Sequence, residues 1–258
     1  MLKRLLLFLH LSTLTLSVMA QQSVVPSKVY KLSAAEVISR ESGKRMPLLL
    51  GSSRDFDFLE MHATSLVPGA SPHAPHAHDD IEELIIVKDG VLEVDIEGNT
   101  QNLEAGSVAM IMPGDQHGIR NGSDAGVTYY TLRYRSKAPK DDARGSHAGG
   151  SFVQHWDDVK YRSHDRGGVR SFFELPTAMC ERFEMHVTTL NAGLQSHPPH
   201  QHRAGEIILM IEGKSKEQIN DQFYEGEAGD FYFLESESLH TIENIGRDAC
   251  MYFAFQFN

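Results

Sequence analysis

Two stretches of the sequence decide the fold, His73-Ala-Pro-His-Ala-His-Asp-Asp-Ile-Glu-Glu83 and His197-Pro-Pro-His-Gln-His-Arg-Ala-Gly-Glu206. The histidines of the second stretch follow those of the first by 124 positions, and the register drops to 123 at the glutamates. Upstream, Leu59-Glu-Met-His-Ala-Thr-Ser-Leu66 matches Phe183-Glu-Met-His-Val-Thr-Thr-Leu190. Downstream, the matched pairs are Gly90 with Gly213, Gly106 with Gly229, His117 with His240, and Asn121 with Asn244. So many matches in one register identify an internal duplication.

Each copy has the pattern of an all-β domain. In the first copy, segments 83–87, 91–96, 107–112 and 128–134 are rich in β-branched or aromatic residues and are separated by Gly, Asn, Asp or Pro. Short strands at this spacing are typical of sandwiches and barrels. We expect the domains at 24–136 and 152–258, with a Gly- and Ser-containing linker at 137–151. Each copy is also expected to open with a short helix, because Ser33 to Glu36 has capping-box spacing before Val37-Ile38.

The N-terminus has the pattern of a secretory signal peptide. Lys3 and Arg4 precede a mostly apolar run at 5–18, and small-residue cleavage is expected after Ala20. A membrane anchor would need about 20 apolar residues, and this run is shorter and interrupted by polar residues. The pattern predicts a secreted or periplasmic protein. In such an oxidising compartment Cys180 and Cys250 could pair, and the sequence leaves this open.

The charge balance excludes some partners. The 258 residues include 35 acidic and 24 basic side chains, for a net charge of −11, and no basic block. Phosphate backbones and anionic lipid surfaces would repel such a chain, so no nucleic-acid partner and no membrane partner after signal cleavage is expected. The unusual figure is 14 histidines.

The repeated histidines and glutamates predict metal sites. Alternate residues of a strand share a face, so the two histidines of each His-x-His pair project together. Three imidazoles and one carboxylate suit a divalent transition metal, with Mn and Fe best matched and Ni, Co, Cu and Zn as alternatives. Glu82 competes with Glu83, but only Glu83 keeps the spacing to Gly90 that Glu206 keeps to Gly213. The predicted ligands are His76, His78, Glu83 and His117 in the first copy, and His200, His202, Glu206 and His240 in the second.

Other repeated or mismatched residues leave alternatives open. His73 and His197 precede each pair and could support the ligands, form a rim or lie exposed on a loop. His62 and His186 alternate with Met61 and Met185, so one of the two faces must pack against a core or the other barrel. At the last strand, Arg133 aligns with Gln256 and Tyr130 with Phe253. An arginine near a metal would orient a carboxylate substrate, and a surface arginine on an edge strand is slightly favoured.

These motifs resemble those of the cupin superfamily. Gly69, His76, His78, Glu83 and Gly90, then Gly106, Pro113, Gly114, His117 and Asn121, are similar to the two cupin motifs. Gly193, His200, His202, Glu206 and Gly213, then Gly229, His240 and Asn244, repeat them. The resemblance implies a bicupin: two tandem jelly-roll β-barrels with a metal inside each, which can associate further into homo-oligomers. The second copy departs at Glu235-Ser-Glu-Ser, which replaces the Pro113-Gly-Asp-Gln turn and leaves that loop geometry in question.

Three functions are compatible with this resemblance. The favoured one is a metal-dependent enzyme of dioxygenase or decarboxylase type, acting on a small organic acid or phenolic compound, as in similar oxalate decarboxylases and quercetinase-type dioxygenases. The second is a non-redox isomerase, lyase or hydrolase acting on a sugar acid or ureide. The third is a non-catalytic binding cupin, and the intact ligand sets of both copies count against it. The sequence assigns no catalytic residue beyond the predicted metal ligands.

Overall fold

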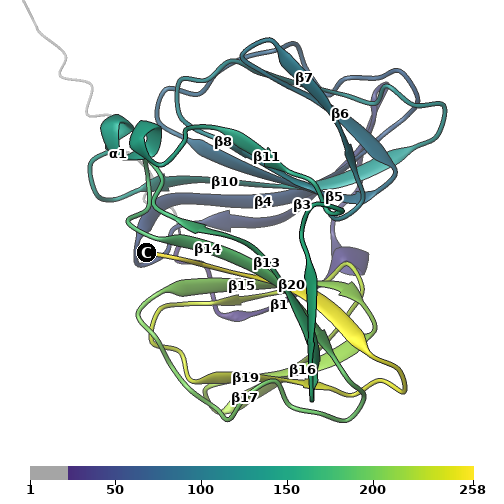
Figure 1. The fold of residues 1–258 in the computed structure, drawn as a ribbon, viewed down its shortest axis with the longest axis vertical. Coiled ribbons are helices and arrows are strands. Elements are labelled where there is room, and N and C mark those ends of the chain that lie inside the picture. The colour runs from purple at the N-terminus through teal and green to yellow at the C-terminus, as the bar shows by residue number, and fades with distance from the viewer. Residues whose placement is uncertain (1–22) are drawn as a thin grey trace, which may run out of the picture.

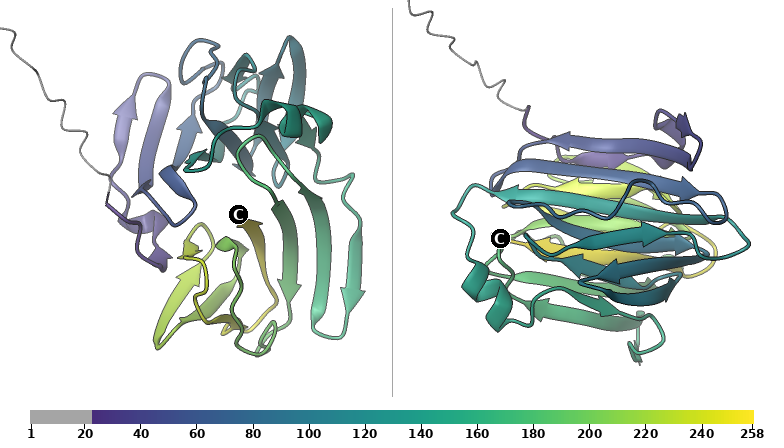
Figure 2. Two further views of the ribbon diagram at one scale, coloured as in Figure 1. Left: turned by 90° about the vertical axis from the view of Figure 1, so that its left-hand side faces the viewer. Right: turned by 90° about the horizontal axis from the view of Figure 1, so that it is seen from above.

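The computed structural model describes residues 23–258, so the predicted signal peptide lies outside the described residues. The all-β class is confirmed: the chain forms two barrels, each made of one seven-stranded and one three-stranded sheet. Figures 1 and 2 show the two barrels stacked on each other. Within residues 23–258, no helix is long and apolar enough to cross a membrane.

The N-terminal barrel combines strands of the first copy with one strand from the start of the second copy. The three-stranded sheet has the order β7 (Asn99–Glu104), β6 (Val91–Ile96) and β9 (His117–Arg120). The seven-stranded sheet has the order β11 (Phe152–Gln154), β8 (Val108–Ile111), β5 (Glu82–Asp89), β10 (Val127–Ser136), β4 (Phe56–Leu66), β3 (Gly43–Gly51) and β2 (Ile38–Arg40).

The C-terminal barrel repeats this order strand for strand. Its three-stranded sheet is β17 (Gln222–Glu227), β16 (Lys214–Ile219) and β19 (His240–Asn244). Its seven-stranded sheet is β1 (Lys28–Tyr30), β18 (Phe231–Leu234), β15 (Gly205–Glu212), β20 (Cys250–Phe257), β14 (Phe183–Leu190), β13 (Gly167–Leu175) and β12 (Tyr161–His164).

The two halves exchange their first strands. Strand β1, from the start of the first copy, pairs with β18 of the C-terminal barrel, and β11, from the start of the second copy, pairs with β8 of the N-terminal barrel. Gly106 and Gly229 allow these crossing segments to approach. Both have positive φ angles, and a Cβ would lie 2.4 Å from the Trp156 ring at Gly106 and 2.9 Å from Leu32 at Gly229. The two glycines therefore allow the close approach of the exchanged segments and also adopt the positive φ of a turn.

The pleat of the large sheets separates two kinds of interior. Along β10, Val127 and Tyr129 point into the barrel, whereas Tyr130, Leu132 and Tyr134 point toward the other barrel. The largest apolar cluster therefore lies between the two large sheets rather than inside either barrel. There Tyr130 Oη donates a hydrogen bond to the carbonyl oxygen of Gly229 over 2.9 Å. This shared core fixes the barrels against each other, because neither large sheet could expose its apolar face to water.

Several expectations about local structure need correction. The helix expected near Ser33 is a single 3-10 turn, η1 (Leu32–Ala34), and Val37 and Ile38 lead into β2 because a barrel edge strand begins there. The described part of the second copy has no opening helix. A short helix, α1 (Asp142–His147), lies instead in the segment expected to be a linker, where Asp141 caps it and buried Gly145 packs against Ala178. The domain limits remain predictions.

Cys180 and Cys250 are buried free thiols in separate apolar clusters.

Candidate metal centres

The structure brings the three histidines of the first copy together. Candidate ligand nitrogens of His76, His78 and His117 all lie within 4.8 Å of one another. The Nε2 atoms of His76 and His78 are 3.0 Å apart, and His78 Nε2 lies 3.6 Å from Glu83 Oε2. Two atoms that each bind one ion at about 2.1 Å can be at most about 4.2 Å apart, so the 3.0 and 3.6 Å separations fit a shared ion.

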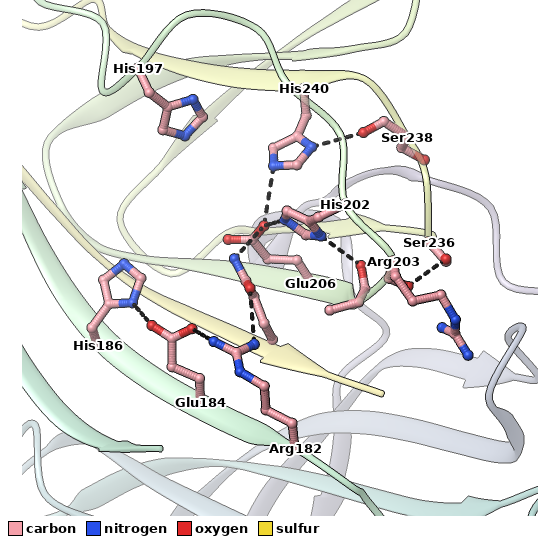
Figure 3. A network of polar contacts seen from close by, with 12 residues as sticks. Arg182, Glu184, His186, His197, His202, Arg203, Glu206, Ser236, Ser238 and His240 are labelled. Carbon is pink, nitrogen blue, oxygen red and sulfur yellow. Dashed lines mark hydrogen bonds and ion pairs between the residues drawn. The ribbon is translucent and has the colours of Figure 1, made fainter. Parts of the chain in front are cut away.

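The second copy forms the same cluster in the C-terminal barrel. Candidate ligand nitrogens of His200, His202 and His240 also lie within 4.8 Å of one another. Glu206 Oε2 lies 3.1 Å from His202 Nε2 and 3.2 Å from His240 Nε2 (Figure 3). Each sequence-predicted set is therefore brought together within its own barrel.

Backbone pairing places these ligands. His76 and His117 exchange backbone hydrogen bonds of 2.9 and 2.8 Å, and His200 and His240 exchange bonds of 3.1 and 2.8 Å. The loop that carries each His-x-His pair is therefore tied to the first residue of β9 or β19. Glu83 and Glu206 reach the same point from the large sheet, on β5 and β15.

Hydrogen bonds at Nδ1 leave Nε2 free to bind metal. His117 Nδ1 lies 3.1 Å from the Asp115 carbonyl oxygen, and His240 Nδ1 lies 2.8 Å from that of Ser238. A carbonyl only accepts, so Nδ1 carries the proton and Nε2 keeps its lone pair. Among residues 23–258, the buried His117 Nε2 has no hydrogen-bond partner, which is the condition expected of a ligand atom.

The surroundings of the clusters favour a neutral His76 and ionised glutamates, whereas the hydrogen bond to Glu206 raises the pKa of His202. Burial, with the neighbouring His73, His117 and His78, lowers the pKa of His76 to about 4. Burial opposes ionisation of Glu206, but its hydrogen bonds to His202 and His240 outweigh that effect and lower its pKa to about 2. The pKa of Glu83 is also lowered, because His78, His117 and Arg133 outweigh burial. The neutral imidazole of His76 and the ionised carboxylates are the forms that metal binding needs.

The structure separates Glu83 from its competitor Glu82. Glu83 points into the barrel beside the histidines, whereas Glu82 points the other way, into the contact between barrels. There Glu82 accepts hydrogen bonds from Thr177 Oγ1 over 2.8 Å and from the Met179 backbone N–H over 2.9 Å. The neighbouring glutamates thus have separate structural roles.

Amide substitutions at these two positions test the assignment. Glu83→Gln is expected to lower metal affinity of the N-terminal barrel by about 100-fold or more, because it removes the charged ligand. Glu82→Gln should leave metal content unchanged and cost about 1–2 kcal/mol of unfolding free energy, because its amide nitrogen replaces one of the two oxygens that accept from Thr177 and Met179. Metal analysis and thermal unfolding measure the two effects. Equal metal loss in both variants would contradict the assignment.

The structure shows where the other repeated histidines lie. His73 packs edge-to-face on His76 at 4.3 Å between ring centroids, and His197 packs likewise on His200 at 4.2 Å. Both therefore support a predicted ligand. His62 points into the N-terminal barrel, while Met61 packs in the core between barrels. His186 and Met185 repeat this arrangement.

Each cluster of predicted metal ligands borders a cavity. The N-terminal cavity, of about 280 Å³, is lined by side chains that include Glu83, His73 and His62. The C-terminal cavity, of about 270 Å³, is lined by side chains that include Glu206, His197 and His186.

The expectation of a surface position for Arg133 is wrong: β10 lies inside its sheet, between β4 and β5, and Arg133 lines the N-terminal cavity.

Sequence reasoning missed Glu217. This residue of β16 is fully buried, and neither carboxylate oxygen has a hydrogen-bond partner among residues 23–258. Burial, and the charge of Glu206, raise its pKa well above the usual range. Glu217 pairs across the sheet with Ile242, as Val94 pairs with Ile119 in the N-terminal barrel. The signal that could have found it is this mismatch between an apolar and an acidic residue at equivalent positions.

The loop whose geometry was in question is conserved between the copies. The backbone N–H of Gly114 donates to the His78 carbonyl oxygen over 2.7 Å, and that of Glu237 donates to the His202 carbonyl oxygen over 2.8 Å. Glu237 adopts the left-handed conformation of Gly114, with φ of 62° against 92°. The second copy thus keeps the turn, although a non-glycine residue at positive φ is strained.

Comparisons with known proteins agree with the fold and the duplication. The cupin-domain family model matches residues 63–132 and 186–255, and together these matches span more than half of the chain. The protein belongs to the cupin family, as a bicupin with one such domain in each half. No curated protein matches the chain.

Solved structures show the same architecture at low sequence identity. The crystal structure of the protein Ylba from E. coli has a TM-score of 0.71 and 15% identity, covering 93% of this chain and 95% of that one. Oxalate decarboxylase from Lactobacillus farciminis, in a formate complex, has a TM-score of 0.70 and 17% identity, covering 92% and 88%. AerE from Microcystis aeruginosa has a TM-score of 0.66 and 17% identity, covering 90% and 99%.

Proposed function

We propose that this bicupin is a metal-dependent enzyme that acts on a small oxygen-rich molecule, an organic acid or a phenolic compound. The observation that carries the proposal is the convergence of three histidines and one glutamate beside a cavity, in both barrels. The donor set suits Mn or Fe, and the likeness to an oxalate decarboxylase supports the decarboxylase or dioxygenase class. When bound, such a metal would act as a Lewis acid toward substrate oxygen or take part in redox chemistry.

The protein's own groups bind and orient the substrate. The cavity beside the predicted ligands of each barrel, of about 280 Å³ in the N-terminal barrel and about 270 Å³ in the C-terminal barrel, has room for a small molecule. A cluster of buried apolar residues fills the rest of each barrel. The signal-peptide pattern supports the further proposal that the enzyme works in the periplasm or outside the cell.

Metal analysis and oxygen uptake test this function. The purified mature protein is expected to hold stoichiometric divalent metal and to lose thermal stability when a chelator removes it. A panel of dicarboxylates and flavonols is then assayed for oxygen uptake and carbon dioxide release. Absence of both metal and chelator sensitivity would end the enzyme proposal. Turnover that is equally fast without dioxygen and releases no carbon dioxide would overturn the oxidative class and favour a non-redox isomerase, lyase or hydrolase.

A further inference from the structure

The two cavities carry different charges although the barrels are copies. The N-terminal cavity is lined by four basic side chains and one carboxylate, namely Arg40, Lys44, Arg45, Arg133 and Glu83. The lining of the C-terminal cavity has one arginine, Arg166, and one carboxylate, Glu206. Because the predicted metal ligands are the same in both barrels, the difference in charge comes from the cavity walls.

Two arginines of the N-terminal cavity share one buried carboxylate. Arg133 donates from Nε to Glu60 Oε2 over 2.7 Å and also from Nη2, while Arg45 donates from Nη2 to Glu60 Oε1. Burial opposes ionisation of Glu60, but His62 and Arg133 outweigh it and lower the pKa of Glu60 to about 2. One carboxylate thus binds two guanidinium groups. Together, Glu60, Arg45 and Arg133 carry a net positive charge, and both arginines keep N–H groups that do not donate to Glu60.

The C-terminal barrel lacks both arginines at the equivalent positions. Arg45 pairs with Thr64 on the neighbouring strand, and the residue that pairs with the equivalent Thr188 is Val169. Gln256 occupies the position of Arg133 on the last strand. Its side-chain amide nitrogen donates to Glu206 Oε2 over 3.4 Å, and its amide oxygen accepts from Arg182 Nη1 over 3.4 Å.

The carboxylate of the C-terminal barrel that is equivalent to Glu60 also has different partners. Glu184, the equivalent of Glu60, pairs with Arg182 and lies 3.1 Å from His186 Nδ1. Arg182 does not line the C-terminal cavity. Within residues 23–258, the N-terminal barrel therefore presents paired guanidinium groups to its cavity and the C-terminal barrel does not.

We propose that the N-terminal cavity binds the carboxylate of a small organic acid through Arg45 and Arg133, and that the C-terminal cavity does not hold this anion in the same way. The inference rests on the proposed function for the role of the metal beside it. Guanidinium groups fixed by a buried carboxylate are preorganised to donate two parallel hydrogen bonds to a second carboxylate. Arg133 and Gln256 are then specificity-determining residues that distinguish the two centres.

Calorimetric titration with malonate tests the inference on the full mature protein loaded with metal. One tight site per chain is expected, with affinity that falls as salt concentration rises. Arg133→Gln should weaken this site by about 10-fold or more, because it removes a charged hydrogen-bond donor. Arg133→Lys should retain part of the affinity. Gln256→Ala, at the matched position of the other barrel, should leave the tight site unchanged.

Separate measurements distinguish failure of this inference from failure of the proposed function. Unfolding temperature and metal content are recorded for every variant, and Lys44→Gln provides a second cavity variant that leaves Glu60 and its arginines intact. Two equal malonate sites that are insensitive to Arg133→Gln would overturn the inference while leaving the metal centres in place. A tight site that depends on Arg133 in a protein that cannot be loaded with stoichiometric metal would support the anion site and overturn the proposed metal enzyme.

Discussion

Replacing His202 by Ala is expected to remove metal from the C-terminal barrel and leave the N-terminal barrel loaded. His202 Nε2 lies 3.1 Å from Glu206 Oε2 at the centre of the cluster, so the substitution deletes one of four donor groups. Loss of groups that only support a metal ligand typically lowers affinity 10- to 100-fold, and loss of a ligand is expected to cost more than about 100-fold. Metal analysis should give half of the wild-type content.

The reciprocal change, His76→Ala, is the matched experiment in the other barrel. It should also halve the metal content, and the double variant should hold none. Because a bound ligand stabilises the folded state by about 4 kcal/mol at 1,000 times its dissociation constant, the double variant should also become insensitive to chelator. His155→Ala is a suitable control, since His155 contacts Gln101 and Glu104 away from both clusters. Unchanged metal content in both single variants would refute the ligand assignment.

Glu217→Val is expected to raise the unfolding free energy by about 1–3 kcal/mol. The wild-type carboxyl group is fully buried and unpartnered within the described chain, and such a group typically costs about 1–3 kcal/mol in proteins. Valine is the residue at the equivalent Val94, so the barrel geometry accommodates it. Each kcal/mol corresponds to about 2–4 °C in unfolding temperature for a chain of this size. Calorimetry of metal-free protein measures the effect.

The pH dependence of this effect has a defined sign. Because the pKa of Glu217 is raised in the folded state, the carboxyl group is protonated in both states below its ordinary value of 4.5. Above that pH the unfolded chain releases the proton and the folded chain keeps it, so the wild type loses stability relative to Glu217→Gln as pH rises. The difference should grow until the folded carboxyl ionises. In the opposite direction, Val94→Glu should destabilise the N-terminal barrel. A constant difference between pH 4 and 8 would contradict a raised pKa.

The fold was predictable because the duplication doubled every signal. One His-x-His pair is weak information, but two pairs with matched glycines, glutamates and later histidines indicated both the cupin motifs and the barrel pair. The strand at 91–96 was predicted at the limits that β6 has. The turn at Glu237 was in question because the Pro-Gly signal was missing. Its hydrogen bond to the His202 carbonyl oxygen shows that tertiary contacts can impose the same turn on a different sequence.

Features that depend on which face a residue occupies were not predictable in the same way. Arg133 was expected on a surface because the sequence does not give the pairing of β10 with both β4 and β5. Glu82 and Glu83 are adjacent, and only the pleat of β5 separates a residue in the barrel from one between barrels. The helix expected at Ser33 failed because the local capping pattern competes with pairing of β2 to β3.

The exchange of β1 and β11 makes the two copies inseparable. A gene fragment that encoded residues 24–136 alone would lack β11, the edge strand that covers β8, and would leave β1 with no partner. It would also expose to water the apolar face that now meets the other barrel. Loss of either repeat is therefore expected to destabilise its neighbour. One barrel could therefore diverge in chemistry, as Arg133 and Gln256 have, while the other preserved the shared scaffold.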